Sequence, residues 1–430
     1  MRTFLIVLLG RFASLIGSQM TGFAMTLWVW DVAGRATPLA MLAVATLIPR
    51  LLMSLFAGVL VDRLNRRLLM VLGTAVSAIA TLTMLLLFLG DRLEIWHLYF
   101  TGIVTGVFNY MQGLSYTTSI SLLMPERHYA RASALQSLQV GAALVVAPGA
   151  AGVIYAQTGL GSILAIELVM LAIAMVTLCI VRIPQPESPP QSLEAAPHEP
   201  IWSQIAFGFR YLQRHAALKA LLVFFLVENF VDSACMNVIS PMLLARSDND
   251  SAFMGTLYSA FGVGGLLGGA LISVWGGPRR RMRGLLASMA VWSLGLVVLA
   301  VTSDATLQIG IAVLGGFCMP FSASCTQAIW QSRVEPEVQG RVFASRFLVT
   351  QSATPLGAAI AGPLADRFFE PAMQPGGFLA GSLGNIFGVG AGAGMAVQVA
   401  LFSAVGVGLA LGAYQIEQLM AFDREQTVPT

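Results

Sequence analysis

Charged side chains are scarce in this sequence. Asp, Glu, Lys and Arg together make up 10% of the 430 residues, whereas hydrophobic residues make up 57%. A soluble globular domain carries about 25% charged residues, so this composition excludes a water-soluble fold. It indicates an integral membrane protein, for which we expect a lipid bilayer as surroundings and no nucleic-acid partner.

Cysteine and histidine are also rare, and neither occurs at metal-binding spacing. The cysteines lie in apolar stretches and the histidines in loops or at helix ends: Cys179, Cys235, Cys318, Cys325, His97, His128, His198 and His215. We interpret the cysteines as core thiols without a disulfide framework. No glycine-rich loop with a phosphate-binding lysine occurs. We therefore expect no metal, no cofactor and no enzymatic activity, and an ion gradient must supply the energy for any transport.

Apolar runs long enough to cross a bilayer recur along the whole chain. About 20 apolar residues span the hydrocarbon core. The sequence predicts twelve spans, at about 3–30, 38–61, 68–89, 96–124, 132–156, 160–183, 218–244, 252–275, 284–303, 306–332, 342–364 and 389–414. The expected fold is an all-α membrane protein of two pseudo-symmetric six-helix bundles.

Lys and Arg are distributed unevenly between the connections. With both termini placed in the cytoplasm, 18 of the 24 lie on the cytoplasmic side, and four, Arg35, Arg92, Arg246 and Arg367, lie on the other. Cytoplasmic loops of membrane proteins carry this excess of positive charge. We expect a multi-pass protein of the cell (inner) membrane with cytoplasmic termini.

Residues 184–217 interrupt the succession of spans. Four prolines between residues 184 and 190 predict a linker. Apolar residues at helical spacing, Ile201, Ile205, Phe209 and Leu212, then predict an amphipathic helix on the membrane surface. We expect an N-terminal bundle (1–183), a cytoplasmic linker (184–217), a C-terminal bundle (218–414) and a cytoplasmic tail (415–430).

The turn between the second and third spans gathers one acid and three arginines. It reads Gly58-Val-Leu-Val-Asp62-Arg63-Leu-Asn-Arg66-Arg67. Gly58 permits close approach of another backbone, and the Asp62 carboxylate can meet the N-terminus of a facing helix. The pattern resembles the signature loop of the major facilitator superfamily. That resemblance implies two halves that rock around a midplane site, with this loop closing the cytoplasmic side; the alternative is a basic loop without a gating role.

The two halves of the chain show weak internal similarity. At an offset of 210 residues Arg131 falls on Arg341 and Gly152 on Gly362, and at 211 Gly58 falls on Gly269. The turn after Gly269 is basic like its counterpart but has no acid. We interpret the offset as a duplication into two parallel repeats.

Three further stretches indicate one branch of this superfamily. Gly17-Ser18, residues 37–49, and the stretch from Gly340 to Gly362-Pro-Leu-Ala-Asp366-Arg367 are similar to a bacterial branch of macrolide-efflux proteins and enterobactin-type siderophore exporters. The resemblance implies export, and it defines the direction of transport better than the substrate.

Ionisable residues within predicted spans are costly and are read as functional. Glu228 and Asp232, with Asn229 between them, lie one helical turn apart in the seventh span, about 15 Å from its start. We hypothesise that the two acids carry the coupling proton or bind a cationic substrate. The alternative is that they hydrogen-bond a neighbouring span or face water at the rim.

Arg11 and Arg50 are the cations deep within predicted spans. Each requires a carboxylate or carbonyl partner. Glu167 in the sixth span is one candidate, and Glu228 or Asp232 is another.

Small residues and prolines recur in the fifth and eleventh spans. Ala147, Pro148 and Gly152 resemble the antiporter motif of drug/proton exchangers, with Pro355, Gly357 and Gly362 as counterparts. We expect close packing and helix bending there, or ordinary small-residue packing. The arginine that such exchangers often carry before Gln112-Gly113 is absent, because Asn109 stands there, so proton coupling would use other groups.

Aromatic, methionine and amide side chains are expected to line a central cavity. The candidates are Trp28, Asn109, Tyr110, Gln112, Tyr116, Met236, Met319, Phe321 and Gln327. Rings and thioethers suit large amphipathic molecules. The sequence therefore favours a monomeric secondary transporter that exports a hydrophobic or amphipathic small molecule, such as an antibiotic or siderophore, with protons as coupling ion. The alternatives are an inward permease for a lipid-like or nutrient molecule and a non-transporting membrane sensor or scaffold.

Overall fold

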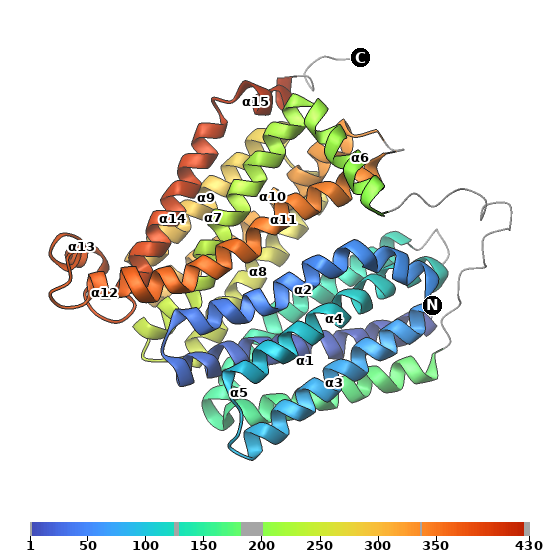
Figure 1. Cartoon of the computed structure of the whole chain (residues 1–430), viewed down its shortest axis with the longest axis horizontal. Coiled ribbons are helices and arrows are strands. Elements are labelled where there is room, and N and C mark those ends of the chain that lie inside the picture. The colour runs from blue at the N-terminus through green and yellow to red at the C-terminus, as the bar shows by residue number, and fades with distance from the viewer. Residues whose placement is uncertain (1, 124–128, 182–200, 336–337, 425–430) are drawn as a thin grey trace. The chain divides into compact units, whose positions relative to one another are not determined.

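The computed structural model describes residues 2–123, 129–181, 201–335 and 338–424, which are almost entirely α-helical and contain no β-strand. Figure 1 shows the long helices: α1 (Arg2–Ala33), α2 (Ala36–Arg63), α3 (Arg66–Leu89), α4 (Ile95–Leu123), α5 (Tyr129–Ile180), α7 (Ala216–Arg246), α8 (Ser251–Trp275), α9 (Arg281–Val301), α10 (Ala305–Arg333), α11 (Gln339–Leu364) and α14 (Ala393–Ala413). The short ones are α6 (Ile201–Arg214), α12 (Glu370–Met373), α13 (Ala380–Phe387) and α15 (Glu417–Arg424). A π-helical turn, Ala365–Phe369, joins α11 to α12.

Nine helices of the described chain are long and apolar enough to cross a membrane, namely α1, α2, α3, α5, α7, α8, α9, α10 and α14. Helices satisfy all their backbone hydrogen bonds internally, which lipid requires. Helices α4 and α11 have spanning length, 29 and 26 residues, but carry more polar side chains, such as Gln112 and Arg346. The expected number of twelve spans requires these two helices and both arms of α5, and it stays a prediction.

Helix α5 consists of two arms that meet at Gly159. This residue has φ 72° and ψ −168° within a 52-residue helical stretch. That backbone conformation is accessible to glycine and strained for other residues. The arms coincide with the fifth and sixth predicted spans, so a single glycine stands where the sequence predicts a connection.

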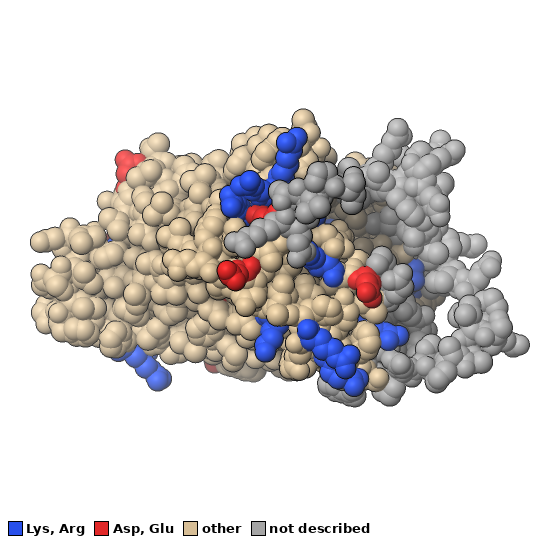
Figure 2. All heavy atoms as spheres, turned by 90° about the horizontal axis from the view of Figure 1, so that it is seen from above, with Lys and Arg blue, Asp and Glu red and all other residues tan. Residues whose placement is uncertain are grey.

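Uncharged residues cover most of the face of the molecule in Figure 2. Most of the Lys and Arg side chains on that face lie from the middle of the view towards its right. Large apolar side chains are strongly exposed on the long helices, such as Leu86 at 61% and Val176 at 56%. Large apolar side chains exposed along so many helices are typical of a surface that faces lipid. Together with the nine spanning helices, they identify a multi-pass membrane protein.

The chain divides into two compact units. The first unit comprises Met1–Trp28 and Ala45–Ser203, and the second comprises Val29–Val44 and Gln204–Thr430. The end of α1 and the start of α2 therefore cluster with the second unit, although the rest of both helices belongs to the first. We call residues 29–44 the strap.

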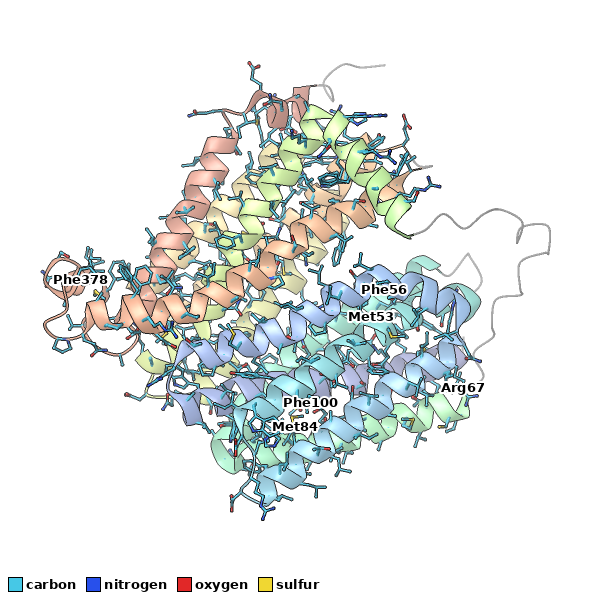
Figure 3. The ribbon with its side chains drawn as sticks, in the orientation of Figure 1. Met53, Phe56, Arg67, Met84, Phe100 and Phe378 are labelled. Atoms are coloured by element: carbon cyan, nitrogen blue, oxygen red, sulfur yellow. The ribbon has the colours of Figure 1, made fainter. Side chains whose placement is uncertain are left out.

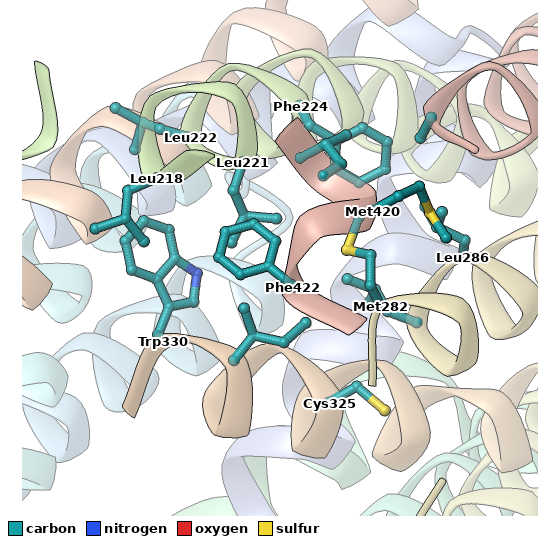
Figure 4. Packing of buried hydrophobic residues seen from close by; sticks show 14 of the residues in the cluster. Leu218, Leu221, Leu222, Phe224, Met282, Leu286, Cys325, Trp330, Met420 and Phe422 are labelled. Atoms are coloured by element: carbon teal, nitrogen blue, oxygen red, sulfur yellow. The ribbon is translucent and has the colours of Figure 1, made fainter. Parts of the chain in front are cut away.

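Figure 4 shows a hydrophobic core of the second unit, built from α6, α7, α9, α10 and α15. Leu212, Leu221, Met282, Trp330 and Phe422 are at most 3% exposed there. The amphipathic helix predicted for the linker corresponds to α6. Its Leu212 and Tyr211 pack on this core, whereas Phe209 of the predicted apolar side is 43% exposed. Residues 184–200 of that linker lie outside the described residues.

Two carboxylates cap helix N-termini in the second unit. Asp423 of α15 accepts hydrogen bonds from Met282 N at 2.9 Å and Arg283 N at 3.1 Å, in the first turn of α9. Glu370 accepts one from Met395 N at 2.8 Å, in the first turn of α14. Burial raises the pKa of Glu370, although its backbone donors oppose this. Both contacts satisfy N–H groups that a helix start leaves unpaired.

Glycines allow α8 and α10 to cross in close contact. A Cβ atom on Gly316 would lie 1.8 Å from the Phe261 carbonyl oxygen, and one on Gly264 would lie 2.0 Å from the Val313 oxygen. The two backbones therefore touch, as at small-residue crossings of membrane helices.

Gly316→Ala is expected to destabilise the protein by about 1–3 kcal/mol, because the added methyl must push the two backbones apart. The measurement is the thermal melting temperature of the detergent-purified protein. Gly269→Ala on α8 is the matched control, since nothing lies within 4 Å of its added Cβ. Equal melting temperatures for the two variants would contradict this account of the crossing.

Candidate functional site

A cavity of about 710 Å³ lies within the second unit, between α7, α8, α9, α10, α11 and α14. Its wall combines rings and thioethers with polar groups. The apolar contributors include Phe225, Met236, Phe261, Met289, Trp292, Met319 and Phe402, and the polar ones include Glu228, Asn229, Asp232, Ser322, Gln327, Arg346 and Gln351. Its volume and mixed lining suit a drug-sized amphipathic molecule.

Glu228 and Asp232 face this cavity from α7. Both are half-buried, and they lie one helical turn apart, so that their negative charges repel each other. The Trp292 side chain lies near Asp232 on the wall of the same cavity. Among the described residues, Glu228 has no hydrogen bond or ion pair, whereas the Asn229 side chain donates to the Phe225 carbonyl oxygen at 2.6 Å. The two acids therefore offer acceptor oxygens to the contents of the cavity.

Arg346 of α11 lines the same cavity, although the sequence predicts it as one of the 18 cytoplasmic Lys and Arg residues. Its guanidinium lies 5.0 Å from the centre of the Trp330 ring and 5.4 Å from that of Phe343. Its Nη1 is buried without a hydrogen-bond partner within the described part of the chain. The signal in the sequence was its position seven residues inside the eleventh helix, deeper than a loop arginine.

The nine residues predicted to line a cavity are divided between different surroundings. Met236, Met319 and Gln327 line the cavity of the second unit. Phe321 packs on Phe317 and Trp275 at ring distances of 5.1 and 6.3 Å.

The others lie in the first unit. Ser77 donates to Asn109 Oδ1 at 3.0 Å and Gln112 donates to Thr74 Oγ1 at 2.8 Å, so both amides are held at the contact of α3 with α4. Tyr116 is buried and Trp28 is half-buried.

Glu167 is enclosed by hydroxyl groups in the first unit and is 4% exposed. Ser18 of α1 donates to its Oε1 at 3.2 Å, and Thr81 of α3 donates to its Oε2 at 3.0 Å. The Gly17-Ser18 pair singled out in the sequence thus brings a donor to this acid. The hydroxyls replace the water that the carboxylate would otherwise bind.

The two arginines of the predicted spans lie against aromatic rings. The Arg11 guanidinium is 5.9 Å from the centre of the Tyr116 ring, and that of Arg50 is 5.9 Å from the Tyr110 ring. Among the described residues neither is ion-paired with Glu167, which was one of the candidate partners. Cation–π contacts take the place of the carboxylate partner.

The arginines of the signature loop bind the ends of neighbouring helices. Arg66 Nη1 donates to the Thr118 carbonyl oxygen of α4 at 2.8 Å. Arg67, at the start of α3 in Figure 3, donates to Leu178 O at 3.0 Å and Cys179 O at 2.7 Å, in the last turn of α5. Cations at helix C-termini are favourable. The backbone of Gly58, Asp62 and Arg63 is helical, and the side chains of Asp62 and Arg63 lie outside the described residues.

The small residues of the packing motif lie in helix contacts. In α5, Ala147 is fully buried and Pro148 lies within the helix, and Gly152 is buried as well. In α11, Pro355 and Gly357 are buried, and a Cβ on Gly357 would lie 2.5 Å from the Phe230 carbonyl oxygen of α7.

No cluster of three His, Cys, Asp or Glu residues that could hold a metal ion occurs in the described parts of the chain. The charged side chains, rings and thioethers of the cavity wall favour binding by charge, ring stacking and apolar contact.

Glu167→Ala is expected to lower the free energy of unfolding by about 1–3 kcal/mol, because it leaves two buried hydroxyl groups without their acceptor. Glu167→Gln keeps a carbonyl oxygen for one of them and is expected to cost less. The melting temperatures of the two variants in detergent check this order of stability. A melting temperature of Glu167→Ala at or above that of Glu167→Gln would contradict the hydroxyl enclosure.

Comparisons with known proteins agree with this architecture. Residues 7–358 match the family model of the Major Facilitator Superfamily. Macrolide efflux protein A of Streptococcus pyogenes is 25% identical over 362 residues, covering 83% of this chain and 88% of that protein. Multidrug efflux pump Tap of Mycolicibacterium fortuitum is 22% identical over 368 residues, covering 84% and 89%.

Two solved structures show the same fold. The nucleoside transporter NupG has a TM-score of 0.66 at 13% identity, covering 98% of this chain and 99% of that one. A bacterial homologue of the human lysosomal transporter Spinster, in an inward-facing and unoccupied conformation, has a TM-score of 0.67 at 16% identity, covering 100% and 98%. The family match extends over most of the chain, so this protein belongs to the major facilitator superfamily and is a secondary transporter rather than an enzyme.

Proposed function

We propose that this transporter exports cationic amphipathic compounds of drug size across the cell membrane by alternating access. The observation that carries the proposal is the pair Glu228 and Asp232, which faces a cavity of about 710 Å³ walled by rings and thioethers. A bound cation would pair with the two carboxylates, and its apolar body would pack on side chains such as Trp292 and Met289. The names of the relatives, macrolide efflux protein and multidrug efflux pump, support the same substrate class.

Protons are the proposed coupling ion. Two neighbouring carboxylates repel each other when both are charged, so a proton and a cationic substrate compete for the same oxygens. Release of substrate to the outside would then accompany proton uptake. Glu167 is a less suitable carrier, because Ser18 and Thr81 hold both of its oxygens.

The proposed topology has twelve spans in two repeats, with both termini in the cytoplasm, in a monomer of the inner membrane. Its support is the distribution of Lys and Arg, 18 of 24 on one side. In this orientation the signature loop lies at the cytoplasmic end of α2. There the Asp62 carboxylate would meet a facing helix N-terminus when the cavity opens outward.

Glu228→Gln and Asp232→Asn are each expected to reduce export of a lipophilic cation at least about tenfold, and more strongly than export of an uncharged amphiphile. Proteoliposomes with an imposed proton gradient measure both rates. Gln327→Asn, which shortens an uncharged side chain of the same wall, is the control. Proton-driven export of the cation by Glu228→Gln at the parental rate would remove the coupling role. Inward accumulation of a labelled nutrient would favour an inward permease instead.

Asp62→Asn is expected to slow turnover about tenfold or more while leaving insertion and substrate affinity unchanged, because a charge-assisted contact at a helix N-terminus is lost. The rate of export at saturating substrate measures this effect, and size-exclusion chromatography checks the fold. Leu64→Ala, an exposed neighbour in the same turn, is the control. An unchanged maximal rate would contradict the gating role of the loop.

A further inference from the structure

The stretch at the end of α11 repeats the opening pattern of the signature loop. Gly362-Pro-Leu-Ala-Asp366-Arg367 has the same G-x-x-x-D-R spacing as Gly58-Val-Leu-Val-Asp62-Arg63. The signature loop lies at the C-terminal end of α2, whereas Asp366 of the second copy contacts the N-terminal end of the same helix. Helix α2 has 28 residues, so the two copies act about 40 Å apart.

The Asp366 carboxylate caps the N-terminus of α2. Its Oδ1 accepts a hydrogen bond from Ala36 N at 2.9 Å, and its Oδ2 accepts one from Thr37 N at 2.8 Å and another from the Thr37 hydroxyl. All three residues belong to the second unit. A carboxylate that receives several donors at a helix N-terminus is stabilised by charge-assisted bonds and by the helix dipole.

Gly362 brings the two helices together at this point. A Cβ atom there would lie 2.5 Å from Thr37 Cα and 2.9 Å from Ala40 Cβ. One turn later, the π-helical turn Ala365–Phe369 carries Asp366. Such turns insert an extra residue into a helix and are frequent at functional sites. The local backbone thus departs from a regular helix at the residue that contacts α2.

A second contact fixes the other end of the strap. The Trp30 indole donates to Asn249 Oδ1 at 2.7 Å, and Trp30 is 7% exposed. Asn249 lies in the connection between α7 and α8, with φ 62°. The strap is therefore held at the end of α1 by Trp30 and at the start of α2 by Asp366.

We propose that Asp366 is a positioning residue of the transport cycle. It holds the strap on the second unit and must release α2 each time the cavity opens to the outer side of the membrane. The strap continues at both ends into the parts of α1 and α2 that belong to the first unit, so in the proposed cycle these two helices move when the strap is released. Asp366 thus closes the outer side of the transporter, as Asp62 is proposed to close its cytoplasmic side. This inference rests on the alternating access of the proposed function.

The test measures the strap directly and without substrate. Spin labels are placed at Arg35→Cys in the strap and Gln374→Cys after α12, two exposed positions outside the contact, in a variant whose four native cysteines are replaced by serine. Pulsed electron–electron double resonance in lipid nanodiscs then gives the distance distribution. In the parent we expect a main short distance. Asp366→Asn is expected to lower the ratio of the short to the long population about tenfold or more.

Asp304→Asn is the matched control. Asp304 also caps a helix N-terminus, accepting from Leu307 N at 2.7 Å, but it caps its own helix α10. This variant should leave the distances unchanged. Thr37→Val removes the hydroxyl donor while keeping both N–H groups, so it should give a smaller shift than Asp366→Asn and tests the contact if Asp366→Asn does not fold.

An unchanged distribution in a folded Asp366→Asn protein, or an equal shift in Asp304→Asn, would overturn the proposal. That result would leave the export function intact, because the distances are measured without substrate. Conversely, if Glu228→Gln and Asp232→Asn left export unchanged, the distance shift expected for Asp366→Asn would stay the same. The two proposals therefore fail separately.

Discussion

A carboxylate inside a helical bundle needs hydrogen-bond donors that the protein itself supplies, because lipid supplies none. The second unit supplies them largely from helix N-termini: Asp366 caps α2, Asp423 caps α9 and Glu370 caps α14. The first unit supplies hydroxyls from α1 and α3 to Glu167. Each of these acids thereby joins helices that are distant in the sequence, and the packing of both units depends on these contacts.

Glu228 and Asp232 differ from the other acids in this respect. Their carboxylates line the cavity, near the Trp292 side chain, rather than a helix N-terminus. An acid that the fold does not satisfy is available to a ligand or a proton. Arg346 adds a cation to the same wall, held between Trp330 and Phe343. The cavity therefore offers charges of both signs beside rings and thioethers, which favours amphipathic molecules over purely hydrophobic ones.

The long apolar runs predicted the helices well, since lipid leaves a chain of this composition little alternative. The amphipathic linker helix was predictable because its apolar residues recur at helical spacing. Pairings between distant segments were harder to predict. Glu167 was one candidate partner for Arg11, beside Glu228 or Asp232, whereas the structure places Arg11 against Tyr116 and Glu167 among hydroxyls. Charge alone does not distinguish a ring from a carboxylate as a partner for arginine.

The acid missing from the turn after Gly269 is a second example of this limit. Asp423, 141 residues after Met282, caps the helix that follows that turn, and nothing in the local sequence indicates it. The second G-x-x-x-D-R copy was visible in the sequence, but its contact with α2 required the tertiary structure.

Equilibrium binding to the purified protein tests the central claim most directly. The two ligands are a lipophilic quaternary ammonium ion and its uncharged analogue, in which carbon replaces nitrogen, and the variant is Glu228→Gln with Asp232→Asn. The account predicts that the variant binds the cation about tenfold or more weakly and the uncharged analogue with nearly parental affinity. Equal affinities of parent and variant for the cation would contradict it.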